Sequence, residues 1–357
     1  MKNQPACPAR WLSLGANELF DRAGASIAND FDSETQTIMK VLFTDHDMLD
    51  VSLEQGIFKD AGIDLRIAQC RTEDDVIREG RGCSAMLVQY APINARVFEA
   101  LPELRLCARL GAGYDTINAD DAARHGVWVA NSPDYGVGEV SLHALSMMLA
   151  LIRRIVRYDT DIHAGNWHYS SAGRIPRAHD MTVGIVGLGR IGKRFAHYAQ
   201  PIFKRVIAHD PNLIDGDFPQ YVGKVGLEEL FETADAITLH CLLNDGTRGL
   251  VGERLLAKMK PDAYLVNTAR GAVVDTDALV SAMRTDRLAG VALDVLPEEP
   301  IPPDHPLLAD PRVIFSPHAA FYSAASEVEL RRKAAMNIVN WSRNGRPDYP
   351  VVVGRNI

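Results

Sequence analysis

The chain contains 357 residues, of which 47% are hydrophobic and 24% charged, and its formal net charge is −8. This length and apolar content predict two ordinary cores and exclude disordered and collagen-like chains. The acidic balance without a long basic run predicts no nucleic-acid partner. No apolar run approaches the roughly 20 residues of a membrane helix, and the start lacks a secretory signal, so we expect no membrane partner and a cytoplasmic location. The five cysteines are scattered without paired spacing, so neither a disulfide framework nor a metal site is expected.

Residues 1–38 are polar and weakly patterned, and we expect them to form an irregular N-terminal extension. From Met39 onward, short apolar strands alternate with helical patterns, which is typical of a parallel α/β sheet. The predicted strands of this first unit are Met39–Phe43, Ile63–Ile67, Ala85–Val88, Leu104–Ala108 and Val127–Ala130.

A long amphipathic helix is predicted from Glu139 to about Tyr158, because apolar residues recur there at helical spacing and arginines fill the last turns. A final helix is predicted over Ser326–Trp341, and it needs a partner surface because it has no sheet of its own. Between the two helices lies a second set of predicted strands with helical connections, which suits a complete dinucleotide-binding fold. These strands are Thr182–Val186, Val206–Ala208, Ala236–Leu239, Tyr264–Asn267, Val291–Asp294 and Val313–Ser316.

A glycine motif directly follows the first strand of the second unit and opens a helix. Gly187 permits a tight turn, Gly189 lets the backbone approach a pyrophosphate, and Gly192 lets the helix pack on the strand. The unpaired N–H groups and the positive dipole at the start of the helix attract the phosphates. The motif, with Arg190 and Ile191 between its last two glycines, therefore predicts a dinucleotide site.

Asp210 ends the next strand, about twenty residues after the glycines, where a carboxylate can accept hydrogen bonds from the ribose hydroxyls. A 2′-phosphate would be repelled there, and neither Pro211 nor Asn212 offers a cation, so the predicted cofactor is NAD. The alternative is an aspartate that only caps the turn before Pro211.

Three later segments follow predicted strands and carry the residue types that hydride transfer needs. Reduction of a 2-oxo acid requires a cation for the carboxylate and an acid that protonates the developing alkoxide. The segments are Asn267–Gly271, Asp294–Pro300 and Ser316–Ala320. Ligands bind outside the carboxyl ends of such strands, so we expect the segments to form one site.

With these segments the chain resembles the D-isomer-specific 2-hydroxyacid dehydrogenases, from about Met39 to Trp341. The resemblance implies an NAD-dependent oxidoreductase that moves a hydride between nicotinamide and C2 of a small 2-oxo or 2-hydroxy acid. It assigns Arg270, Glu299 and His318 as the catalytic triad, and the Glu-Pro register selects Glu299 over the adjacent Glu298. Arg270 would hold the substrate, His318 would transfer the proton, and Glu299 would favour the charged imidazole.

The same resemblance implies further contacts of both ligands. Ala112 and Gly113 lie in a loop whose backbone would clasp the substrate carboxylate, and Tyr90 would line the same cleft. The family also implies cofactor contacts from Cys241, Leu242, Thr268, Ala269 and Asp294. For the two strand-end loops of the first unit, the alternative is an ordinary strand-to-helix connection without a ligand.

The implied architecture is α/β with two Rossmann-like domains. A flavodoxin-like, discontinuous substrate domain would comprise residues 39–138 and 321–357, and a doubly wound NAD-binding domain would comprise residues 139–320. The long helix and the following arm, with Trp167 and Tyr169, resemble the segment by which family members form homodimers; alternatively these aromatics pack inside one chain.

The local motifs are nearest to the branch with the C-terminal-binding proteins and short phosphoglycerate dehydrogenases. That branch supplies an alternative function, an NADH-responsive corepressor-like binding protein. The chain departs from it at Phe321, where the branch typically has tryptophan. We therefore favour the enzyme, and the sequence leaves its particular 2-hydroxy acid open.

Overall fold

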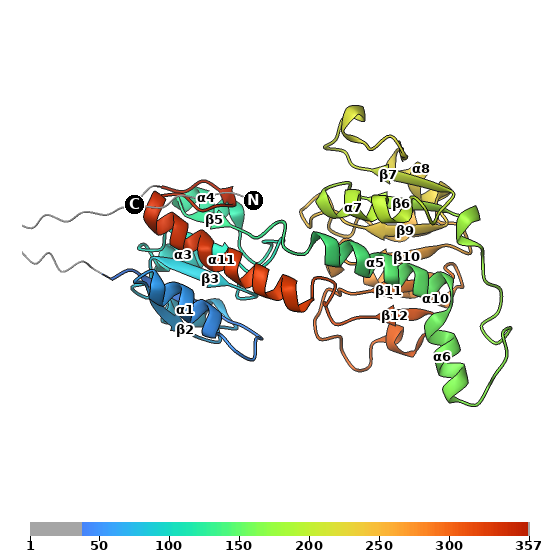
Figure 1. Ribbon diagram of the computed structural model, residues 1–357, viewed down its shortest axis with the longest axis horizontal. Helices are drawn as coiled ribbons and strands as arrows, with labels where there is room; N and C mark the ends of the chain where they lie inside the picture. The colour runs from blue at the N-terminus through green and yellow to red at the C-terminus, as the bar shows by residue number, and fades with distance from the viewer. Residues whose placement is uncertain (1–37, 356–357) are drawn as a thin grey trace, which may run out of the picture. The chain divides into compact units, whose positions relative to one another are not determined.

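The computed structural model describes residues 38–355, and the predicted extension up to residue 37 lies outside the described residues. The first sheet has the strand order β13-β5-β4-β3-β1-β2. Figure 1 labels β5, β3 and β2 of this sheet, in that order. The strands β1 to β5 of this sheet run parallel in the flavodoxin-like order 2-1-3-4-5. The strands are β1 (Lys40–Phe43), β2 (Asp64–Ile67), β3 (Ala85–Val88), β4 (Leu106–Arg109), β5 (Trp128–Ala130) and β13 (Pro350–Val352).

The second sheet has the order β12-β11-β10-β9-β6-β7-β8, and all its neighbouring strands pair in parallel. Counted from β6, this is the doubly wound order 3-2-1-4-5-6 with one further strand at the edge. The two orders confirm the predicted fold class of two α/β units. The strands are β6 (Thr182–Val186), β7 (Arg205–His209), β8 (Val222–Lys224), β9 (Ala236–Leu239), β10 (Tyr264–Asn267), β11 (Gly290–Leu293) and β12 (Val313–Phe315).

Helices connect the strands, as parallel pairing requires. In the first unit these are α1 (Ser52–Asp60), α2 (Glu73–Glu79), α3 (Ala95–Ala100) and α4 (Ala119–His125). The later helices are α5 (Val137–Ile152), α6 (Ile155–His163), α7 (Arg190–Ala199), α8 (Leu227–Thr233), α9 (Glu253–Leu256), α10 (Thr276–Arg284) and α11 (Ala324–Asn344). None of the helices within residues 38–355 combines the length and the apolar character needed to span a bilayer.

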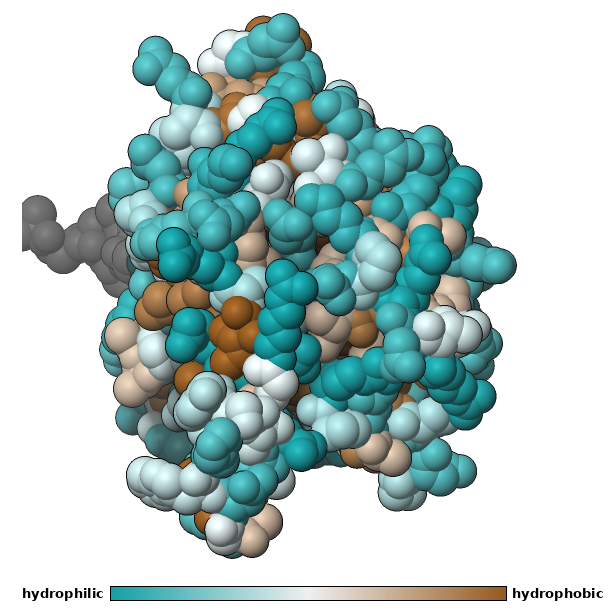
Figure 2. All heavy atoms as spheres, turned by 90° about the vertical axis from the view of Figure 1, so that its right-hand side faces the viewer, coloured by the Kyte–Doolittle hydropathy of each residue, from teal (hydrophilic) through white to brown (hydrophobic). Residues whose placement is uncertain are grey.

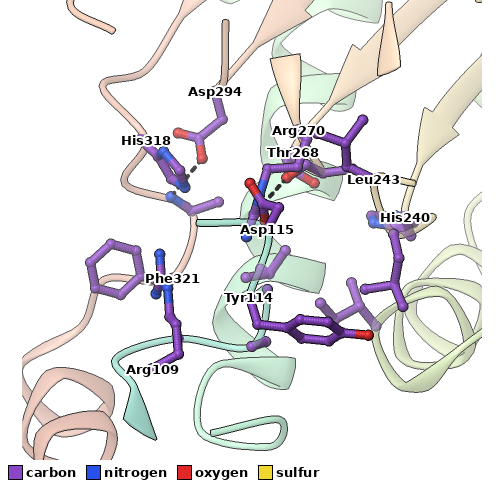
Figure 3. Close-up of a pocket in the computed structure, with 18 of the residues that line it drawn as sticks. Arg109, Tyr114, Asp115, His240, Leu243, Thr268, Arg270, Asp294, His318 and Phe321 are labelled. Carbon is purple, nitrogen blue, oxygen red and sulfur yellow. Dashed lines mark hydrogen bonds and ion pairs between the residues drawn. The ribbon is translucent and has the colours of Figure 1, made fainter. Parts of the chain in front are cut away.

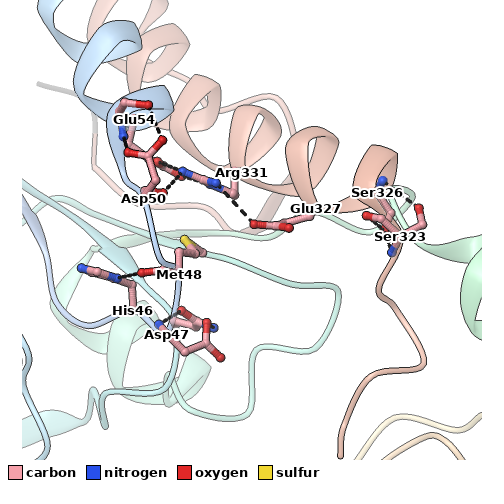
Figure 4. Close-up of polar contacts among 11 residues, drawn as sticks. His46, Asp47, Met48, Asp50, Glu54, Ser323, Ser326, Glu327 and Arg331 are labelled. Carbon is pink, nitrogen blue, oxygen red and sulfur yellow. Dashed lines mark hydrogen bonds and ion pairs between the residues drawn. The ribbon is translucent and has the colours of Figure 1, made fainter.

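Helix α11 packs on the first sheet, which supplies the partner surface that the sequence required. Its apolar face, including Leu330, Ile338 and Trp341, joins the buried cluster of the first sheet. Arg331 forms a buried ion pair with Glu54 of α1 at 2.7 Å and also donates to the carbonyl of Asp50 (Figure 4). The helix thus returns the chain from the second sheet to the first.

The sequence prediction was wrong about three elements. The helix expected over residues 139–158 is two helices, because Arg154 takes a left-handed conformation with φ of 56° between α5 and α6. The short strand β8 was missed, and so was β13, which pairs antiparallel with β5. Both missed strands are only three residues long, too short for a clear alternation of apolar residues.

Candidate active site

A pocket lies between the carboxyl ends of strands from both sheets (Figure 3). The loops after β3 and β4 line it from one side, and those after β9, β10, β11 and β12 line it from the other. The predicted residues that line it are Tyr90, Ala112, Gly113, Ile191, Cys241, Leu242, Thr268, Ala269, Arg270, Asp294 and His318. Residues that lie far apart in the sequence thus meet at one place.

Glu299 contacts the pocket through His318. The Nδ1 atom of His318 lies 2.7 Å from Oε2 of Glu299, while Oε1 accepts a hydrogen bond from the backbone N–H of Leu296. Burial would raise the pKa of Glu299, but the hydrogen bond and charge of His318 outweigh it and hold this pKa below its ordinary value. Because Glu299 occupies Nδ1, Nε2 is the ring nitrogen that remains for a ligand.

His318 has a left-handed backbone, with φ of 52°, which a residue with a side chain rarely adopts. Asp294 holds it there. The Asp294 carbonyl accepts from the N–H of His318 at 2.8 Å, and its carboxylate accepts from the N–H groups of Ala319 and Ala320 at 2.8 and 3.0 Å. The hydroxyl of Ser316 donates to the same carboxylate at 2.5 Å. The nearly buried Asp294 therefore determines where the imidazole stands.

Arg270 follows β10 and reaches across to the first unit. Its Nε lies 2.9 Å from Oδ1 of Asp115, and its guanidinium covers Gly113 so closely that a Cβ there would overlap it. Burial would raise the pKa of Asp115, but the charge and hydrogen bond of Arg270 lower it overall. The backbone of Arg270 is fixed by Asn267, whose Nδ2 donates to its carbonyl at 2.9 Å.

The glycine motif lies where the order of the second sheet reverses, between β6 and β9. Gly187 has φ of 89°, and a Cβ on it would lie 2.7 Å from the N of Cys241. A Cβ on Gly192 would overlap the carbonyl of Gly187, so the start of α7 packs closely on the turn. At Gly189 a Cβ would meet nothing within 4 Å, which leaves open space in front of the unpaired N–H groups of α7. This geometry fits a pyrophosphate.

Asp210 is at the end of β7, next to the glycine turn. Its Oδ2 accepts from the N–H of Leu188 at 2.8 Å, and its Oδ1 accepts from the N–H of Asn212 at 3.0 Å. The carboxylate thus caps its own turn and also ties β7 to the glycine loop. An ionised carboxylate has further lone pairs, so these bonds are compatible with ribose hydroxyls.

Sequence reasoning missed Tyr135, which lines the pocket. It placed Arg109 and Asp115 at the two ends of the substrate loop, and His240 in the loop with Cys241, but assigned none of the three a role of its own. Burial lowers the pKa of His240 to about 3, so its imidazole is neutral and is no proton donor at neutral pH. Burial raises the pKa of the adjacent Cys241 to about 11, so its thiol is not a nucleophile. The sequence signal for Arg109 was a cation at the end of an apolar strand, where that substrate loop begins.

Comparison with known proteins gives the family. The model of the "D-isomer specific 2-hydroxyacid dehydrogenase, NAD binding domain" matches residues 145–320. A glyoxylate reductase of Korarchaeum cryptofilum is 36% identical over 278 residues, which cover 76% of this chain and 83% of that protein. A glycerate dehydrogenase of Methylorubrum extorquens is 32% identical over 292 residues, covering 80% and 90%.

Among solved structures, a D-lactate dehydrogenase from Aquifex aeolicus complexed with NAD and lactic acid is similar, with a TM-score of 0.80 and 27% identity. The match covers 88% of this chain and 100% of that one. The chain belongs to the D-isomer specific 2-hydroxyacid dehydrogenase family. The predicted enzyme class, an NAD-dependent oxidoreductase of 2-hydroxy acids, is thereby confirmed. These relatives are all named as enzymes and give no support to the regulatory alternative.

Proposed function

We propose that the protein reduces a small 2-oxo acid to the D-2-hydroxy acid with NADH in the pocket between the two sheets, using Arg270, Glu299 and His318. The observation that carries this proposal is the bond between His318 and Glu299, set beside the guanidinium of Arg270 in one pocket. Several relatives are named glyoxylate reductases, which makes glyoxylate the first compound to assay.

The protein residues have distinct tasks in this reaction. Arg270 binds the carboxylate and C2 oxygen of the substrate through charge-assisted hydrogen bonds, and Gly113 leaves room for its guanidinium. His318 donates a proton from Nε2 to the developing alkoxide, because Nδ1 is held by Glu299. Glu299 stabilises the charged imidazole before the transfer. Tyr90, Ala112 and Gly113 line the substrate side of the pocket.

NADH, when bound, supplies the hydride that adds to C2. Gly187, Gly189 and Gly192, with Arg190 and Ile191, would hold its pyrophosphate at the start of α7, where the open space beside Gly189 fits that group. Asp210 would accept from the ribose hydroxyls. Contacts at the nicotinamide half would come from the remaining predicted residues, which line the pocket: Cys241, Leu242, Thr268, Ala269 and Asp294.

We also propose the domain division given by the sequence, with a substrate domain of residues 39–138 and 321–357, of which 356–357 lie outside the described residues, and an NAD-binding domain of residues 139–320. The sheets support it, because the strands of the first sheet come only from the first set of residues. A cytoplasmic location stays a prediction.

A homodimer is proposed from the segment around α6. Trp167 and Tyr169 are 84% and 83% exposed, so they do not pack inside the chain. Ile155, Val156 and Ile162 of α6 are also exposed, and they add apolar surface to the same segment. Figure 2 shows a mainly hydrophilic face on which hydrophobic side chains gather in small groups. Sedimentation of the wild type and of Trp167→Ser tests this, and a monomeric wild type would contradict it.

The test of the reaction is NADH oxidation with glyoxylate, pyruvate and hydroxypyruvate. His318→Ala removes the proton donor and should lower kcat roughly 100- to 10,000-fold with NADH binding retained. His197→Ala, at an exposed position of α7, is the matched control and should leave kcat unchanged. Near-normal turnover of His318→Ala would reject the assignment.

A further inference from the structure

Arg109 is a buried cation that forms no ion pair with the other described residues. It ends β4, is only 9% exposed, and lines the pocket. It takes part in none of the ion pairs formed within residues 38–355, and its Nε has no hydrogen-bond partner there. Burying a charge without a partner is costly, so an arginine kept in this state points to a ligand that completes it.

The other charges of the pocket are already balanced. Arg270 is paired with Asp115, and His318 with Glu299. The carboxylate of Asp294 accepts from backbone N–H groups and from a hydroxyl. Arg109 is therefore the pocket cation that remains free for an anion.

The surroundings of Arg109 suit an anion. Burial lowers its pKa, and the nearby positive charge of Arg270 lowers it further. Tyr90 and Tyr135 line the same pocket, and burial raises the pKa of both phenols, that of Tyr135 to about 12. Both phenols thus stay protonated. The hydroxyl of Tyr90 already donates to Asp47 at 3.3 Å, so Tyr135 is the phenol that can donate to an anion. The carboxylate of Asp115 favours the charged form of Arg109, but it forms its ion pair with Arg270.

The two arginines are placed along one loop. The guanidinium of Arg109 covers Gly111 and that of Arg270 covers Gly113, so a Cβ on either glycine would overlap the cation above it. Two residues of backbone span at most about 7 Å, so the cations flank a space of the size of a short carbon chain. Figure 3 shows Arg109 directed toward the loop that carries His318, apart from Arg270.

We propose that Arg109 binds a second anionic group of the substrate, a carboxylate or a phosphate at the end of the C2 substituent. This inference rests on the proposed function, because it leaves the first carboxylate to Arg270. The substrate class is then the 2-oxo acids with two anionic groups, and Arg109 determines the selection between them and the singly charged acids.

The test compares kcat/KM for NADH oxidation with pyruvate, 2-oxoglutarate and 3-phosphohydroxypyruvate. The wild type should favour at least one doubly charged acid over pyruvate by roughly 10- to 100-fold, the range that a charge-assisted contact supplies. A preference for 2-oxoglutarate identifies the second group as a carboxylate, and a preference for 3-phosphohydroxypyruvate identifies it as a phosphate.

Arg109→Met keeps the bulk of the side chain without the charge and should abolish this preference. Its kcat/KM for the favoured acid should fall at least about 10-fold more than its kcat/KM for pyruvate. Arg109→Lys should retain part of the preference. Arg105→Met, at the residue just before the same strand, should leave the preference unchanged. Melting temperatures of all variants show whether they fold, and Arg109→Gln replaces Arg109→Met if the latter does not.

If kcat/KM of the wild type for pyruvate equals or exceeds kcat/KM for both doubly charged acids, the inference is overturned and the proposed reaction stays intact. An equal loss of kcat/KM for all three acids in Arg109→Met would also overturn the inference. If the wild type reduces none of the three acids or glyoxylate, the proposed function fails and the inference fails with it.

Discussion

Asp294→Asn tests how the imidazole is held in place. The change is nearly isosteric, but the amide offers one oxygen acceptor and one NH2 donor where the carboxylate offered two acceptors. In the wild type, Oδ1 accepts from Ser316 and Ala319, and Oδ2 accepts from Ala320. Whichever way the amide turns, its NH2 faces at least one backbone N–H that needs an acceptor.

The cost can be compared with the strain of the loop. Losing a charge-assisted hydrogen bond and leaving a buried N–H unpaired costs about 2–4 kcal/mol. The left-handed conformation of His318 itself costs about 1–2 kcal/mol, which the bonds to Asp294 offset. Because the loss exceeds the strain, we expect the loop to relax and His318 to leave its position for much of the time.

The assay is kcat for 2-oxo acid reduction with saturating NADH, together with the free energy of unfolding in urea. Asp294→Asn should lower kcat about 10- to 100-fold, equivalent to about 1.4–2.8 kcal/mol. Ser316→Ala keeps both contacts of Asp294 with backbone N–H groups and should lower kcat by less than about 5-fold. Asp310→Asn, which disturbs the carboxylate that binds Arg312 outside the pocket, should affect stability without lowering kcat. Wild-type kcat in Asp294→Asn would refute the reasoning.

Three further variants test other contacts. Glu299→Gln removes the charged partner of Nδ1 of His318 and should lower kcat for 2-oxo acid reduction about 10- to 100-fold, the range of one charge-assisted hydrogen bond; wild-type kcat would count against the pairing. Asp210→Ala should narrow the preference for NADH over NADPH, mainly through KM, and equal use of both cofactors by the wild type would show that this carboxylate does not select. Glu54→Gln removes the nearer countercharge of the buried Arg331 and leaves it only the longer contact with Glu327 at 3.4 Å. It should lower the free energy of unfolding by about 3 kcal/mol in urea titrations, the lower end of the cost of breaking a buried ion pair, whereas a loss below about 1 kcal/mol would mean that Glu327 or water compensates.

Local pattern was sufficient for most of the fold. The apolar strands and the glycine turn are read from neighbouring residues, and the two strand orders follow the topologies that such alternation favours. The break at Arg154 could not be read in this way, because the apolar spacing continues past it and only the backbone conformation separates α5 from α6.

The candidate site was predictable in part for a related reason. His318, Glu299 and Arg270 stand in short motifs, and the structure brings all three together at the pocket. Arg109 begins the substrate loop, but the sequence there does not show that its guanidinium is buried without an ion pair. Its importance lies in burial without an ion pair, and this depends on which side chains surround it in space. Asp115 was missed similarly, because its partner Arg270 is 155 residues away in the sequence.

The pairing of Arg270 with Asp115 bears on selectivity. The pair joins the two sides of the pocket while its guanidinium lies above Gly113. A substrate that binds to Arg270 must compete with a carboxylate already in place, so a neutral ligand gains too little to displace it. An anion can exchange with Asp115, and a second anionic group gains the contact with Arg109, whose charge has no competing partner within residues 38–355. The two arginines therefore act unequally. At Arg270 the first carboxylate must replace the ion pair with Asp115, whereas at Arg109 a second anionic group forms an ion pair where none existed. Arg109 therefore contributes most of the selection between substrates.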